Sequence, residues 1–187
     1  MSSKRNKFKC RQRGFSLLEL MVTVAVLAIV TGVAAPSFRS MIQGSRLTAS
    51  SNEMLAVFQS ARMEALRTNS RVDVCPSANG RSCGGTNWRR VIVVSQKNGA
   101  TTVLRDVSIK DDDLSIIASD SISTNRVWYL PDGFVRMGNS SAPAQVGSLG
   151  FCISTLRGEN ARNIRLNMGR ASIERAANVD CKAPGNS

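Results

Sequence analysis

The sequence predicts an α+β protein in which one long N-terminal hydrophobic helix packs on an antiparallel β-sheet domain. Three observations support this prediction. An uncharged apolar stretch runs from Leu20 to Phe38, and a stripe of apolar residues at helical spacing follows it. Beyond Ser70 the chain changes to short runs rich in β-branched residues. A helix followed by a group of strands is the order typical of the α+β class.

The apolar stretch is long enough to cross a membrane. Its nineteen residues would extend about 28 Å as a helix, close to the thickness of a bilayer core. One carboxylate, Glu19, lies at its start, where a charge is unfavourable and therefore usually functional. The segment before it is strongly basic, with six positive charges at Lys4, Arg5, Lys7, Lys9, Arg11 and Arg13.

The helix is expected to continue past Phe38 as an amphipathic half. Pro36 lacks a backbone donor, so we expect it to kink or break the helix there. Thr68-Asn69-Ser70 is a plausible end, because these residues favour turns. The stripe that should pack on the sheet consists of Leu47, Met54, Leu55, Phe58, Ala61 and Ala65.

Short strands are predicted along the remainder of the chain. Lys97-Asn98-Gly99 is typical of a hairpin turn, and Pro131-Asp132-Gly133 of a second turn. The predicted strands are 72–74, 90–94, 101–105, 114–117, 126–130, 134–137, 149–153 and 163–167.

Four cysteines follow the helix, and we expect them to form disulfides. Four cysteines permit three pairings; the local pairs, Cys75–Cys83 and Cys152–Cys181, are favoured. A zinc site is the alternative, but the chain has no histidine and no paired C-x-x-C spacing. No metal and no cofactor are expected.

Charge and composition exclude some functions. The absence of histidine rules out Ser-His and Cys-His nucleophiles, so no catalytic residue is assigned and no enzyme is expected. The formal charge is +12, and removal of the basic leader would leave 19 basic against 13 acidic residues, a net of +6. This charge would attract polyanions without being diagnostic of nucleic-acid binding.

Residues 13–20, Arg-Gly-Phe-Ser-Leu-Leu-Glu-Leu, resemble the prepilin signature of type IV pilins and type II secretion pseudopilins. The resemblance implies that prepilin peptidase cleaves after Gly14 and that Phe15 becomes the methylated amino terminus. Glu19 and Pro36 then occupy the family's fifth and twenty-second mature positions. In a filament, the amine of Phe15 on a neighbouring subunit would neutralise Glu19.

This resemblance implies a domain organisation. Residues 1–14 would be the leader, 15–69 the helix, and 70–187 the β-rich globular domain. Within the helix, residues 15–38 would form the transmembrane segment and later the filament core, and residues 39–69 the amphipathic half.

Two other interpretations compete for the N-terminal segment. A secretory signal peptide would use Gly32-Val33-Ala34 as a cleavage site, but the apolar run exceeds the usual length of such a signal. A plain membrane anchor accounts for the length and the basic leader, but not for Glu19.

The globular part resembles the domain shared by GspH-type pseudopilins and FimT/FimU-type minor pilins. The resemblance rests on residues 88–94, the 130–134 turn and a late strand running into Gly169-Arg170. It implies a minor pilin that waits in the bacterial inner membrane with its globular domain in the periplasm. The pilin would then join a tip or initiation complex with other major and minor pilins. A GspH-like pseudopilin of type II secretion is the alternative.

A DNA receptor is the alternative of another class. FimT-type proteins are associated with DNA capture in natural transformation through a Gly-Arg-x-Arg motif, and here Ser172 replaces the second arginine. Several arginines together would bind the phosphates of double-stranded DNA, whereas a solvated strand edge is the simpler interpretation. The residues that would form the DNA site are Arg162, Arg165, Gly169, Arg170 and Arg175.

Overall fold

The structure, a computed structural model, describes residues 14–97 and 99–186, and the backbone alone at Val33 and Pro36. The chain divides into two compact units, Met1–Arg39 and Ser40–Ser187, and each is described by itself below. The basic leader up to Arg13 and Asn98 of the predicted hairpin lie outside the described residues.

One helix, α1 (Leu17–Thr68), supplies all of the α-structure in the described residues. It is continuous through Pro36, where the sequence predicted a break. A proline removes only one i→i−4 hydrogen bond, and the turns on both sides of Pro36 are α-helical.

The helix ends where its turn-forming residues predict. Asn69 follows it in a left-handed conformation with φ of 49°. The Ser70 N–H donates to the Ala65 carbonyl over 3.3 Å. This is the bond of a Schellman motif, which satisfies a carbonyl of the last turn.

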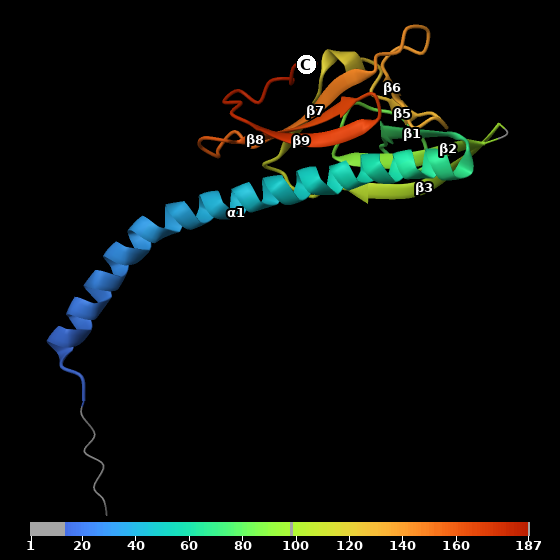
Figure 1. Ribbon diagram of the computed structural model, residues 1–187. Helices are drawn as coiled ribbons and strands as arrows, with labels where there is room; N and C mark the ends of the chain where they lie inside the picture. The colour runs from blue at the N-terminus through green and yellow to red at the C-terminus, as the bar shows by residue number, and fades with distance from the viewer. Residues whose placement is uncertain (1–13, 98, 187) are drawn as a thin grey trace, which may run out of the picture. The chain divides into compact units, whose positions relative to one another are not determined.

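Two antiparallel sheets form the remainder of the second unit, so the predicted α+β class is confirmed (Figure 1). The first sheet has the order β3-β2-β1-β5-β6 and the second the order β4-β7-β8-β9. A 3₁₀ turn, η1 (Asp120–Ile122), lies between β4 and β5. The strands are β1 (Arg71–Pro76), β2 (Arg90–Lys97), β3 (Ala100–Ser108), β4 (Ser115–Ala118), β5 (Val127–Tyr129), β6 (Val135–Met137), β7 (Val146–Cys152), β8 (Ala161–Asn167) and β9 (Arg170–Ala176).

The part of α1 that begins at Ser40 lies along both sheets (Figure 1) and shares one core with them. Five of the six stripe residues predicted from the sequence are fully buried, and Leu55 is partly buried. The first sheet contributes Val72, Val74 and Val91 to this core. The second contributes Leu149, Phe151, Ile164 and Leu166.

Two details of the strands differ from the sequence prediction. The predicted strand 163–167 lies within β8, which ends at Asn167, but the separate strand β9 that follows the turn at Met168 and Gly169 was not predicted. The division into two sheets was also not predicted, because β1 pairs with β5 and β4 with β7 across long segments of chain.

The edge strand β3 is irregular. Its register with β2 shifts between Val93 and Val94, so Leu104 has no partner in the ladder. Beyond this bulge, Asp106 forms an ion pair with Arg90 at 2.6 Å. A bulge and charged residues are the features by which natural sheets prevent edge-to-edge pairing.

Candidate functional site

The apolar half of α1 exposes its large side chains in the isolated chain. Phe15 is 80% exposed, and Leu17 and Ile29 are similarly uncovered. Within the described residues, α1 is the one helix long and apolar enough to cross a membrane, with a mean hydropathy of 2.4 over its most apolar 18 residues. None of these 18 residues is buried. Burial of each such side chain is worth about 1.5–3 kcal/mol, so this surface is suited to lipid or to other helices rather than water.

Glu19 lies in the first turn of α1, just after the non-helical residues Gly14 to Ser16. The Leu20 N–H donates to the Ser16 carbonyl over 3.1 Å, so the helix is established by this point. The positive end of the helix dipole favours a carboxylate there. The structure therefore places Gly14 and Phe15, the predicted cleavage-site residues, and Glu19 together at one end of the apolar segment.

All four cysteines of the globular part are joined in the local pairs that the sequence favoured, Cys75–Cys83 and Cys152–Cys181. The Cα atoms are 5.5 Å apart in both pairs. Because the sulfurs are bonded to each other, none is a thiolate ligand for zinc.

The Cys152–Cys181 disulfide ties the C-terminal tail to β7. The tail is also held by Asn160, whose side chain accepts from the Asn178 N–H over 2.7 Å and donates to the Asn178 carbonyl over 2.9 Å. Farther along, the Ser148 hydroxyl donates to the Gly185 carbonyl. The tail is therefore part of the second sheet's surface.

The candidate DNA-binding arginines do not form one surface. Arg162 is buried, and its guanidinium donates to the carbonyls of Glu159 and Ala161. Burial lowers the pKa of Arg162, and the charge of Arg175 adds to this effect against the opposing influence of Glu159. Arg162 faces inward because alternate residues of a strand point to the same face, and Arg162 lies two residues before the buried Ile164.

Two further candidate arginines are paired within the domain. Arg165 forms an ion pair with Glu174 at 2.8 Å, and Arg175 forms one with Glu159 at 3.6 Å. Arg170 differs from them: it is exposed and makes no hydrogen bond or ion pair with the residues that the structure describes. It is therefore the candidate best placed to meet a partner.

Gly169 has a structural role in placing Arg170. Its φ is 123°, and a Cβ atom there would overlap the carbonyl oxygen of Gly133 in the β5–β6 turn. The same oxygen accepts a hydrogen bond from Arg62 Nε over 3.1 Å. The two turns and α1 thus meet at the Gly133 carbonyl, with Arg62 and Arg170 beside it.

A cleft opens at this junction, which we call the arginine cleft. One part has a volume of about 370 Å³, and an adjoining part of about 420 Å³ shares Arg62 and Arg170 with it. Burial raises the pKa of Tyr129, whose side chain lines the cleft, against the opposing charge of Arg62. The lining residues are Gln59, Arg62, Met63, Tyr129, Asn167, Met168, Gly169, Arg170 and Ala171.

Sequence reasoning missed most of this cleft. Arg62 reads as an ordinary polar-face residue of the helix, and Tyr129 as a strand residue. Only the Gly133 turn and the Gly169-Arg170 pair gave a signal, and nothing in the sequence placed them next to each other.

Comparisons with known proteins define the class. The family described as Type II transport protein GspH matches residues 50–170, and the Prokaryotic N-terminal methylation motif matches residues 9–35. Because the first match covers more than half of the sequence, the chain belongs to the GspH family, and its N-terminal segment carries the methylation motif.

Solved structures agree with this class at the level of fold. Two crystal structures of the type IV minor pilin FimU of Pseudomonas aeruginosa are similar, each with 14% sequence identity. One covers 72% of this chain and 96% of FimU with a TM-score of 0.53, and the other covers 71% and 99% with a TM-score of 0.51. No curated protein matches. The fold is that of a type IV pilin.

The role of Gly169 predicts a specific sensitivity. We expect Gly169→Ala to lower the free energy of unfolding by about 2–4 kcal/mol, because it combines a strained φ with an overlap against backbone. Chemical denaturation of the mature chain in detergent, followed by tryptophan fluorescence, measures this loss.

Gly85→Ala is the matched control. Gly85 also has a positive φ, of 98°, but open space surrounds it, so its loss should be about 1 kcal/mol. Equal losses in the two variants would contradict the contact between Gly169 and Gly133.

Proposed function

We propose that this chain is a minor subunit of a type IV pilus, which enters the filament through the first half of α1. The observation that carries the proposal is the exposed apolar surface of that half, together with the N-terminal methylation motif that matches residues 9–35. Such a rod is stable in a bilayer before assembly and among the helices of other subunits afterwards. A tip or initiation complex is the proposed place of a minor subunit.

The orientation in the membrane follows from charge and redox chemistry. The six basic residues of the leader favour the cytoplasmic side. Two disulfides in the globular unit suit the oxidising periplasm. We therefore propose an inner-membrane precursor whose globular unit is periplasmic. Its role is structural, and cleavage and methylation belong to the prepilin peptidase.

A pseudopilus of type II secretion is the second candidate, favoured by the family match over residues 50–170. The physical mechanism is the same in both filaments, and the difference lies in the neighbouring subunits. Copurification of the cross-linked mature chain with pilus or with secretion subunits separates the two.

We propose that Glu19 sets the position of this subunit in the filament. A carboxylate in an apolar helical core needs a partner, and the freed amine of Phe15 on a neighbouring subunit has the required charge. Loss of one member of a buried ion pair typically costs about 3–5 kcal/mol.

The first prediction from this proposal concerns processing. Mature protein recovered from membranes should begin with N-methylated Phe15, because cleavage after Gly14 removes the basic leader. Mass spectrometry of the N-terminal peptide checks this, with Gly14→Val expected to leave the precursor uncut. Mature material starting at Met1 or Ala35 would refute the proposal.

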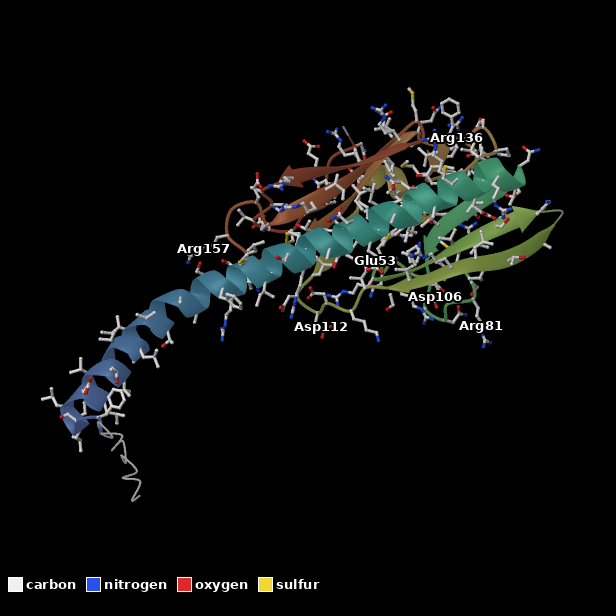
Figure 2. All side chains as sticks on the ribbon, turned by 60° about the horizontal axis from the view of Figure 1, so that its bottom comes forward. Glu53, Arg81, Asp106, Asp112, Arg136 and Arg157 are labelled. Atoms are coloured by element: carbon white, nitrogen blue, oxygen red, sulfur yellow. A yellow bond between two sulfur atoms is a disulfide. The ribbon has the colours of Figure 1, made fainter. Side chains whose placement is uncertain are left out.

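The second prediction concerns assembly. Glu19→Gln should be processed and inserted normally but should enter sheared filaments at about one-tenth of the wild-type level or less, because the ion pair is lost. Immunoblots of membrane and filament fractions measure both quantities. Glu53→Gln is the matched control, since Glu53 is exposed in the second unit (Figure 2). Normal incorporation of Glu19→Gln would exclude the ion pair.

Binding of double-stranded DNA stays a prediction from the family resemblance. If it occurs at the C-terminal arginines, it depends chiefly on Arg170, because Arg162 is buried and Arg165 and Arg175 are ion-paired. Arg170→Ala should then weaken binding by about five- to tenfold at low salt, and Arg165→Ala much less. Gel shifts with the full mature chain measure this. Unchanged binding by an Arg165/Arg170/Arg175→Ala variant would exclude these residues.

A further inference from the structure

The arginine cleft holds positive charge that the domain does not neutralise. Seven other arginines of the second unit have a carboxylate within 3.8 Å: Arg67, Arg71, Arg89, Arg90, Arg126, Arg165 and Arg175. Arg170 has none among the described residues. Arg62 uses Nε on the Gly133 carbonyl, and its two terminal nitrogens have no partner in the described part of the chain. Two guanidinium groups therefore share one cleft without a counter-ion.

The cleft wall adds a polar group that suits an anion. Gln59 contributes an exposed amide from α1. Guanidinium and amide donors at one place match the acceptor oxygens of an oxyanion.

The rim of the cleft is apolar. Met63 and Met168 line it and are 64% and 58% exposed. Leu66 and Phe134 are also exposed, with the Leu66 side chain close to Gly133 and the Phe134 backbone close to Gly169. The guanidinium of Arg136, which is labelled in Figure 2, lies 5.9 Å from the Phe134 ring centroid.

This combination favours a protein ligand over a nucleic acid. Arginine, methionine and aromatic residues are enriched at protein interfaces, whereas a nucleic-acid groove combines basic residues with aromatic platforms for bases. Here Phe134 already lies beside Arg136, and the methionines would face sugar and phosphate unfavourably. A carboxylate flanked by apolar side chains satisfies both the donors and the rim.

We propose that the arginine cleft is the docking site for an acidic–apolar segment of a different filament subunit, whose carboxylate lies between Arg62 and Arg170. The proposal rests on the proposed function, since the partner is a subunit of the same filament. It assigns the second unit, Ser40–Ser187, a contact of its own, separate from the contact that the apolar first half of α1 makes.

The test uses the full mature chain in detergent micelles, labelled with ¹³C at the methionine methyl groups. The probes are acetyl-Leu-Glu-Leu-amide and its neutral counterpart acetyl-Leu-Gln-Leu-amide. We expect the acidic peptide to shift the Met63 and Met168 signals and to saturate about tenfold more tightly than the neutral one. The buried Met54 and Met137 should not move, which reports that the core is intact.

Two variants decide whether the arginines are responsible. Arg170→Gln should weaken the acidic peptide about tenfold and leave the neutral peptide unchanged. Arg81→Gln, at an exposed arginine on another loop (Figure 2), should change neither. Equal affinity for both peptides, or equal effects of both variants, would overturn the proposal.

Competition separates the remaining alternatives. If inorganic phosphate or a short DNA duplex moves the same two signals at lower concentration than the acidic peptide, the cleft is a phosphate site and the proposal is wrong. Because these measurements do not depend on assembly, they can fail while Glu19 and the processed N-terminus still support the filament role. Equally, the cleft can bind the acidic peptide as expected while the tests of Glu19 and of the processed N-terminus fail.

Discussion

One helix has to satisfy two different surroundings, and the rest of the molecule depends on this constraint. From Leu20 to Phe38 the helix carries no charged side chain, and none of its most apolar segment is buried. From Ser40 onward it is apolar on one face, and most of that face is buried against two sheets. The change in periodicity along a continuous helix divides the chain into a rod that needs external partners and a domain that folds around its own core.

The local patterns predicted most of the fold, and the non-local pairings did not. Helical spacing identified the stripe from Leu47 to Ala65, and turn-forming residues identified the end of α1 near Asn69. Strand β9 was not assigned, because Arg170, Ser172 and Glu174 alternate with only Ala171 and Ile173, a weak apolar face. The two sheets depend on pairings such as β1 with β5, for which a single sequence carries no signal.

The arginines of the candidate site are distributed in space differently from what their clustering in the sequence suggests, for a physical reason. A cluster of arginines in sequence suggests a basic surface. In the structure, the alternation of side chains along a strand turns one arginine inward, and carboxylates of the same domain pair with two others. Arg162 points inward with Ile164, and Arg165 and Arg175 each meet a glutamate. The charge that remains available comes from Arg170 together with Arg62, which lies more than a hundred residues earlier in the sequence. Gly169 joins them, because only a residue without a side chain allows the two turns to touch.

The bulged edge strand β3 has a consequence for crowding. In the proposed filament, the globular units of neighbouring subunits would be at very high local concentration, and a straight apolar edge would allow neighbouring sheets to pair. The interrupted ladder at Leu104 and the charged Asp106 and Arg90 beyond it discourage such fusion. An edge of this kind therefore favours globular units that stay separate from one another.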